Sequence, residues 1–320
     1  MSFSPNRLRA VLFQLGVFAA AGLLAWFFIH NTLANLEARR IASGFGFLQR
    51  EAGFEIGETT FLAFSAADSY LRALGVGLLN TFRVAAIGVV FATVVGTLIG
   101  LARLSPNWLL ARISTAYIET LRNVPLIVQL FFWYAVISEN LPGPREALNP
   151  LPGVFLSNRG VVFPLPGSTP VLEGFNFAGG MALTPEFAAL LLGLVLYTAA
   201  FVAEIVRAGV LAVDRGQHEA AAALGLPRWR AMRLVILPQA LRVMVPPMTS
   251  QYLNLTKNSS LAVAIGYPDL VSIANTTMNQ TGQAIEGIAI IMAVYLSISL
   301  SISAFMNWYN KRIALRGAAR

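Results

Sequence analysis

The stretch from Glu204 to Pro238, EIVRAGVLAVDRGQHEAAAALGLPRWRAMRLVILP, decides how the rest of the chain is interpreted. It is the longest polar and charged run between strongly apolar segments. Its alanine-rich part, 219–224, is a strong helix former. Gly225 follows where a helix C-terminus favours glycine, and Pro227 stands just beyond, where the helix cannot continue. A second short helix is predicted from Arg228 until Pro238. The stretch therefore predicts a compact helix–turn–helix in water, of the kind that grips another molecule.

The composition of the chain is that of a membrane protein. Of its 320 residues, 56% are hydrophobic and 12% are charged, and the mean hydropathy is +0.65. These values exclude an ordinary soluble domain. A membrane span needs about 20 mainly apolar residues. Six stretches qualify, of which the third and fifth are interrupted by charge and proline: 11–29, 76–102, 112–138, 186–206, 241–263 and 286–309. The sequence therefore predicts an all-α polytopic membrane protein with about six transmembrane helices.

The distribution of positive charge predicts how the chain is oriented in the membrane. The formal net charge is +8, and only two of the 23 basic residues are lysines. Basic chains can bind nucleic acid, but here the arginines gather between spans, with six of them in 207–242. The positive-inside rule then puts both termini and this segment in the cytoplasm, and 30–75 and 139–185 outside. Lipid is a predicted partner, and nucleic acid is not.

Metal and disulfide chemistry are not indicated by the sequence. The chain has no cysteine, which excludes disulfides and thiolate metal sites. His30 and His218 lie far apart without a ligand pattern. Residues 1–29 have a basic start and an apolar stretch, as a signal peptide does. The uncharged part is too long for a signal-peptide core, however, and residues 30–32 offer no small-residue cleavage site. We predict a retained membrane anchor.

A spaced motif in 219–238 resembles a known family. Three residues separate Glu219-Ala220-Ala221 from Gly225, and nine residues separate Gly225 from Val235. Leu237-Pro238 then follows. This pattern resembles the EAA loop of binding-protein-dependent ABC transporter permeases, where isoleucine is usual in place of Val235. An ordinary amphipathic loop is the plainer interpretation, but it does not account for the full spacing. In the family this loop fits a cleft on the ATPase subunit and carries its motion into the membrane.

Other stretches narrow the resemblance to the polar amino acid branch of the family. Residues 117–132 look like the R-x-x-P-x-x-x-Q stretch of amino acid permeases, and 203–209 are close to A-E-I-x-R-x-G. The proline- and glycine-rich segment 139–185 cannot be membrane helix. Its Ser157-Asn158-Arg159-Gly160 resembles the insertion of general L-amino acid uptake systems. This external cap contacts a soluble binding protein or is a passive cover. The resemblance covers roughly 75–310.

The resemblance implies a type I ABC importer permease core with an extra N-terminal helix. The implied division is 1–74 for the anchor and an external segment, 75–310 for the core, and 311–320 for a basic cytoplasmic tail. Within the core, 139–185 is the external insertion and 207–240 is the cytoplasmic coupling loop. The residues expected to couple to the ATPase are Glu219, Ala220, Ala221, Leu224, Gly225, Leu226, Trp229, Leu237 and Pro238.

The resemblance also implies the partners of the chain. The chain would be one multi-pass subunit, in the bacterial inner membrane, of an ATP-driven importer for polar or general L-amino acids. A periplasmic or extracellular binding protein would deliver the substrate. A second permease, homologous or identical, would complete the pathway. No G-x-x-x-x-G-K-[ST] motif is present. ATP and Mg would therefore be held by two partner ATPase subunits, and this chain would be neither an enzyme nor a cofactor carrier.

Polar residues inside the predicted spans are candidates for the substrate pathway. Arg122 lies about 16 Å along a helix that begins near Ala111. It would bind a substrate carboxylate, or else pair with Glu119 one helix turn away. Glu204 would meet a substrate ammonium, or else face Arg207 at the cytoplasmic interface. Each candidate thus has a purely structural alternative.

The fifth predicted span is too polar for a helix that faces only lipid, so one of its faces should line a cavity or a subunit interface. Its Lys257 would contact substrate, or else extend its ammonium group to the outer interface. The complete set of candidates for the substrate pathway is Arg122, Gln129, Glu204, Gln251, Asn254 and Lys257.

Two other classes of protein remain as alternatives. A secondary amino acid transporter that works without an ATPase would need paired ionisable groups in the membrane or an inverted repeat. Neither is clear in this sequence. A channel or scaffold protein with a basic cytoplasmic loop would leave the EAA-like spacing as a coincidence. Copurification of an ATPase separates the permease hypothesis from both.

Overall fold

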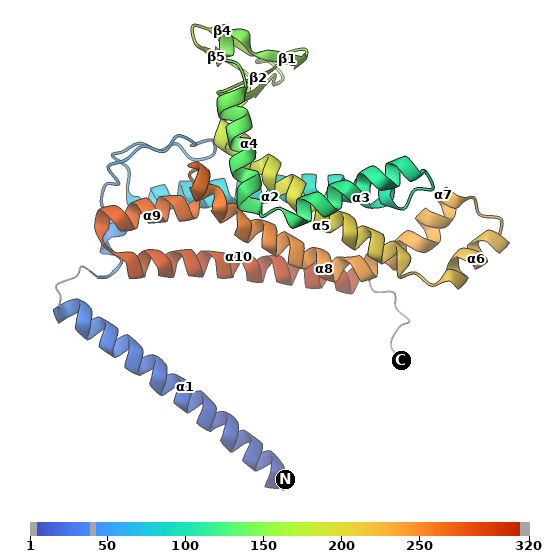
Figure 1. Cartoon of the computed structure of the whole chain (residues 1–320). Helices are drawn as coiled ribbons and strands as arrows, with labels where there is room; N and C mark the ends of the chain where they lie inside the picture. The colour runs from blue at the N-terminus through green and yellow to red at the C-terminus, as the bar shows by residue number, and fades with distance from the viewer. Residues whose placement is uncertain (1–4, 39–42, 314–320) are drawn as a thin grey trace.

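The computed structural model describes residues 5–38 and 43–313, so most of the predicted tail 311–320 lies outside it. The long helices α2, α5, α8 and α10 lie roughly along one direction, and α1 stands apart from them at an angle (Figure 1). α4 turns away from the bundle, and a small β-structure sits at its far end. The helices are α1 Pro5–Ala38, α2 Tyr70–Arg103, α3 Trp108–Asn123, α4 Leu126–Asn140, α5 Pro185–Leu211, α6 Arg215–Ala223, α7 Arg228–Ala231, α8 Leu237–Asn258, α9 Leu270–Thr281 and α10 Ala284–Ile313.

Four of these helices are long and apolar enough to cross a membrane, namely α1, α2, α5 and α10. The predicted span 241–263 corresponds to α8 followed by a 3-10 turn, Ser259–Ile265. It does not reach the same apolarity, because polar residues recur along its exposed face. The predicted span 112–138 is wrong as one straight helix. The structure divides it into α3 and α4, which are bent by 105°.

The break between α3 and α4 follows from Pro125. A residue before proline is pushed out of the helical region, and proline has no N–H to continue the ladder. Val124 is accordingly extended, with φ −87° and ψ 126°. The buried Gln129 stabilises the break, since its Nε2 donates to the carbonyl oxygens of Leu121 and Val124, each at 3.0 Å.

The centre of the bundle is the contact between α2 and α5, and it depends on two glycines. A Cβ atom on Gly96 would lie 2.6 Å from Cβ of Val202, and one on Gly100 would lie 2.6 Å from the carbonyl oxygen of Ala203. Both distances are far below normal contact, so only glycine permits this approach. The G-x-x-x-G step in the sequence therefore serves close helix packing. Much of α5 is buried, including Leu190, Leu194 and Ala199.

The segment 43–69 is fixed to this bundle by a buried ion pair. Arg83 of α2 donates to Glu58 at 2.9 Å, and their side chains are 2% and 9% exposed. The other carboxylate oxygen of Glu58 accepts from Thr184, the N-cap of α5. The described residues of this segment contain only one helix, the five-residue 3-10 helix Phe45–Gln49, because positive-φ glycines interrupt the segment.

The predicted external cap is ordered and contains two small antiparallel sheets. The larger has the order β1-β2-β3-β6, and the smaller is the β4–β5 hairpin. The Ser157–Gly160 motif forms the turn between β2 and β3. Phe155 stacks on Phe177 at 4.5 Å between ring centroids and joins the two sheets. The strands are β1 Leu148–Leu151, β2 Val154–Ser157, β3 Gly160–Phe163, β4 Val171–Glu173, β5 Asn176–Ala178 and β6 Met181–Leu183.

The glycine contact makes a direct prediction about stability. Gly100→Leu should destabilise the protein by about 1–3 kcal/mol, because overpacking forces the two helices apart. The thermal midpoint of unfolding in detergent measures this. Gly22→Leu on α1 is the matched control, since nothing lies within 4 Å of a Cβ built there. Equal midpoints for the two variants would contradict the role of Gly100.

Candidate functional site

The EAA-like motif forms a capped helix at the end of the bundle where α5 finishes (Figure 1). Asp214 is its N-cap and accepts a hydrogen bond from the Gly216 N–H at 2.7 Å. At the other end Gly225 has φ +70°. Its N–H donates to Ala222, and the N–H of Leu226 donates to Ala221. These two hydrogen bonds form a Schellman motif, so glycine is needed at this position for its left-handed backbone.

The second helix of the element does not end at Pro238, as the sequence suggested. α7, a π-helical turn Met232–Ile236 and α8 follow one another directly, with Pro238 in the first turn of α8. The N–H of Leu237 donates to Met232, five residues back. The wider π turn leaves room for the proline ring, which would otherwise clash with the carbonyl four residues before it. Motion of the loop is therefore connected directly to α8.

Large apolar side chains of this element are strongly exposed. Leu224 is 79% exposed, Trp229 is 60% exposed and Leu234 is 62% exposed. These side chains are candidates for contact with another protein. Among the other predicted coupling residues, Glu219, Ala220, Gly225, Leu237 and Pro238 are exposed, Leu226 is half-buried and Ala221 is buried.

Contacts within the protein hold the element against the bundle. Gln239 of α8 donates to Gln217 of α6 at 3.0 Å. Val213, just before α6, packs in a buried cluster with Val210 of α5 and with Ile236 and Ala240. The element is therefore fixed to both α5 and α8. Gln217, Gln239 and Asp214 were not among the site residues predicted from the sequence. Only Asp214 carried a local signal, as an N-cap residue before a helix.

The pathway candidates on α3 and α4 have different surroundings. Arg122 is exposed in the last turn of α3, with its guanidinium carbon 5.0 Å from the Phe201 ring centroid. No ion pair joins it to Glu119 within the described residues. Gln129 is buried at the helix break, and its Oε1 lacks a hydrogen-bond partner in the described chain. Arg122 is thus exposed at the surface of the described chain, whereas the amide nitrogen of Gln129 stabilises the break between α3 and α4.

Glu204 lies between two arginines. One carboxylate oxygen is 2.6 Å from Nη1 of Arg103 at the end of α2, and the other is 2.6 Å from Nη2 of Arg207. The side chains of the three residues are 21–30% exposed, so this is a partly buried group at the end of the bundle. The carboxylate thus has the local partner, Arg207, that the structural alternative expected. The partner on α2, Arg103, was missed.

The pathway candidates on α8 follow one helix face. Asn254 and Lys257 are exposed and Gln251 is half-buried. The exposed positions recur every three or four residues, as expected for one side of a helix: Val243, Pro246, Ser250, Asn254 and Lys257. A polar face of this kind in a membrane helix needs water or another protein against it. Within the described residues no ion pair joins Lys257 or Arg122 to Glu204, so the structure does not gather the charged candidates into one group.

Comparison with known proteins identifies the family. Residues 88–315 match the model of the binding-protein-dependent transport system inner membrane component. The chain belongs to this family. It is 48% identical to YhdX of Escherichia coli K12, which bears the name of an amino-acid ABC transporter permease, over 98% of this chain and 96% of that protein. It is 42% identical to the general L-amino acid transport system permease protein AapQ of Rhizobium johnstonii, over 96% of this chain and 92% of that protein.

A solved structure extends the comparison to three dimensions. The crystal structure of an amino acid ABC transporter with histidines has a chain that is 28% identical, with a TM-score of 0.57. The match covers 76% of this chain and 95% of that one. In the described part of our structure, no group of three His, Cys, Asp or Glu residues could hold a metal ion. Both the sequence relatives and the solved structure support the interpretation of the chain as a transporter permease.

The Glu204 group makes a prediction that can be checked without a transport assay. Glu204→Gln should lower the thermal midpoint of unfolding, because each charge-assisted hydrogen bond to the carboxylate contributes about 1.5–3 kcal/mol. Asp68→Asn is the control, since its pair with Arg72 spans 3.4 Å and the Arg72 side chain is 44% exposed. Exposed pairs contribute about 0–1 kcal/mol. A larger loss for Asp68→Asn would contradict the assignment.

Proposed function

We propose that the chain is a permease subunit of an ATP-driven importer for polar L-amino acids. The named relatives, which it matches over nearly its whole length, support this substrate class. The described structure supplies a bundle with an exposed polar helix face and a rigid element at one end. Type I permease architecture accounts for both features. We infer a division into an anchor with an external segment, 1–74, a core, 75–310, and a tail, 311–320.

The observation that carries the proposal is the 214–238 element. It presents Leu224 at the C-cap of α6, a helix whose two ends are closed by an N-cap and a Schellman motif, and Trp229 on α7 just beyond the turn. An ATPase cleft lined by apolar side chains would bury these two groups. ATP and Mg then belong to that partner, because this chain has no phosphate-binding motif.

The packing behind the element explains how force would enter the membrane. The cluster around Val210, Val213 and Ile236 connects it to α5, and the direct continuation of α7 connects it to α8. ATPase closure would therefore move both helices as packed bodies rather than bend the loop. Rigid-body rocking of this kind alternates access to a central pathway.

A second permease would cover the polar face of α8. Asn254 and Lys257 need water or a partner there, and a homologous or identical subunit supplies both a wall and a wet pathway between the halves. We retain Arg122, Gln251, Asn254 and Lys257 as proposed pathway residues. For Gln129 and Glu204 the structural roles described above favour positioning over substrate contact.

We infer an inner-membrane location with both chain termini in the cytoplasm. This orientation puts the arginine-rich 207–242 on the inner side and the cap on the outer side. A soluble binding protein would deliver substrate at that outer face. The cap presents Leu151 at 63% exposure and Phe175 at 70% exposure, so its surface suits contact with another protein.

Reconstituted transport tests the proposed function. Proteoliposomes receive the chain with its candidate ATPase, partner permease and binding protein, added singly and together, and labelled amino acids are offered. We expect uptake that requires ATP and every component. Uptake by this chain alone under an ion gradient would instead indicate a secondary transporter. Gradient-driven flow of unrelated solutes through this chain alone would indicate a channel.

Gly225→Asp tests the coupling role of the turn. The left-handed φ of Gly225 makes a substituted residue cost about 1–2 kcal/mol locally, while no atom lies within 4 Å to clash with a Cβ. We therefore expect normal membrane assembly, with most ATP-dependent uptake lost because the docking helix is misplaced and carries a new charge. Gly225→Asn is the matched control, since asparagine tolerates this conformation. Normal uptake by the aspartate variant would refute the coupling role.

A further inference from the structure

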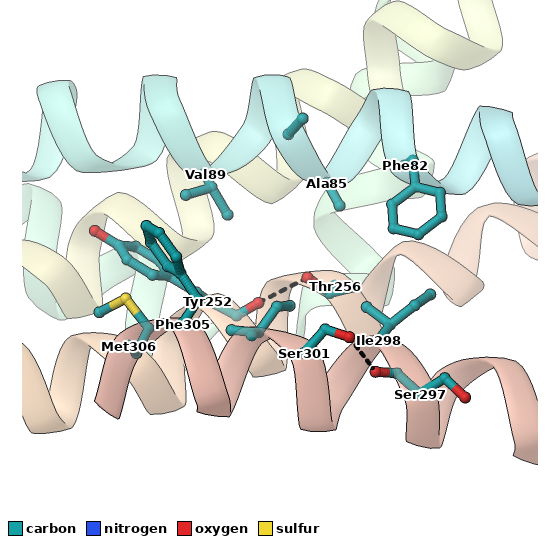
Figure 2. Close-up of a pocket in the computed structure, with 12 residues that line it drawn as sticks. Phe82, Ala85, Val89, Tyr252, Thr256, Ser297, Ile298, Ser301, Phe305 and Met306 are labelled. Atoms are coloured by element: carbon teal, nitrogen blue, oxygen red, sulfur yellow. Dashed lines mark hydrogen bonds between the residues drawn. The ribbon is translucent and has the colours of Figure 1, made fainter. Parts of the chain in front are cut away.

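A deep apolar groove runs along the bundle between α2 and α10, with α8 as its floor. Its volume is about 540 Å³. Figure 2 shows Phe82, Ala85 and Val89 extending from α2 toward it, with Ile298 and Phe305 on the opposite side. Few polar side chains line the groove, and the Thr256 hydroxyl donates a hydrogen bond to the carbonyl oxygen of Tyr252 in its own helix. The groove therefore suits an apolar occupant.

A ridge of small residues runs along α10 and reaches the groove at Ser297 and Ser301. Ala289, Ala293, Ser297 and Ser301 recur every four residues, and all four are exposed. The hydroxyls of Ser297 and Ser301 donate to Ala293 and Ser297 of their own helix at 2.7 and 2.8 Å. With the serines satisfied internally, the ridge offers a flat surface with no unpaired donor. Such a surface permits close approach of another helix.

α1 has a complementary surface and no contact that buries it. None of its apolar window within Val11–Thr32 is buried in the structure. Gly16 and Ala20 lie four residues apart on one of its faces, and nothing lies within 4 Å of a Cβ built on Gly16. A small-xxx-small pair on each of two helices is the pattern that lets membrane helices pack backbone to backbone.

The chain itself holds the C-terminal end of α1 near the start of α10. The N–H of Gly44 donates to Glu286 in the first turn of α10 at 2.5 Å. Six residue steps separate Gly44 from Ala38, the last residue of α1, and each spans at most about 3.5 Å. The C-terminal end of α1 therefore stays within about 21 Å of Gly44, which contacts the start of α10. Figure 1 shows these two helix ends at the left of the bundle. Two membrane helices that meet end to start in this way run antiparallel when they pack side by side.

The two helices also match in depth. The candidate spans are Val11–Thr32 in α1 and Ala284–Arg312 in α10, and their midpoints lie near Ala21 and Ile298. In antiparallel packing with these midpoints level, Ala20 lies within one helical turn of Ser297 in depth, and Gly16 within one turn of Ser301. We propose that α1 packs antiparallel in the α2–α10 groove in the membrane, with Gly16 and Ala20 against the small-residue ridge. This proposal does not depend on the transported substrate.

Cysteine crosslinking in the assembled transporter tests the packing. The chain has no native cysteine, so Ala20→Cys with Ser297→Cys gives a single defined pair. A protease site inserted at 39–42 allows α1 to be cut from the core after mild oxidation in membranes. We expect the cut fragments to remain joined without reductant, at the size of one chain, and to separate when reduced. A disulfide requires Cα atoms about 4.4–6.8 Å apart, so it reports direct packing.

Phe18→Cys with Ser297→Cys is the matched control, because Phe18 lies on the opposite face of α1 from Ala20. We expect this pair to remain largely uncrosslinked. A product of two-chain size would overturn the proposal in favour of α1 packing on a second copy. Failure of the Ala20 pair to join, or equal joining of the Phe18 pair, would leave lipid as the occupant and also overturn it. Each variant is scored only after its uptake activity shows that it has assembled.

Discussion

The architecture depends on the backbone contact between α2 and α5. Gly96 and Gly100 let the two helices approach until a single added carbon would overlap the opposite backbone. Membrane helices gain little from the hydrophobic effect against one another, so close van der Waals packing has to supply the attraction. This contact also brings the end of α2 to Glu204, where Arg103 binds. The position of the loop that follows α5 is thus a consequence of two missing side chains.

Ion pairs at opposite ends fix the same two helices. Arg83 and Glu58 are almost fully buried and also contact Phe187 and Thr184 at the start of α5. Breaking a buried pair by removing one partner costs about 3–5 kcal/mol, because the other charge is left unpaired. The bundle therefore has a rigid axis, and a rigid axis suits a subunit that transmits motion. The groove beside α10 is, by contrast, loosely filled.

Local signals in the sequence predicted local structure well. Gly225 was assigned to a helix C-terminus from its place after an alanine-rich run, and its positive φ confirms this. The effect of proline was predicted wrongly at two positions, in opposite directions. At Pro238 we expected a helix end, but a π turn accommodates the ring and the helix continues. At Pro125 we expected a continuous span, but the backbone extends and Gln129 stabilises the break. Proline removes one hydrogen bond in each case, and the neighbouring residues decide the outcome.

The sequence by itself determined the class of fold and the family, because apolar stretches and a spaced loop motif depend only on residue order. The sequence also predicted a polar face on α8, because the spacing of polar residues along a helix can be recognised without knowing what the helix packs against. Only the tertiary structure decided which charges meet. Glu58 with Arg83 and Glu204 with Arg103 are far apart in the chain, and no local pattern encodes such pairing. The contact of Glu204 with Arg103 arises because glycines set the distance between α2 and α5, and that distance is a property of two packed surfaces.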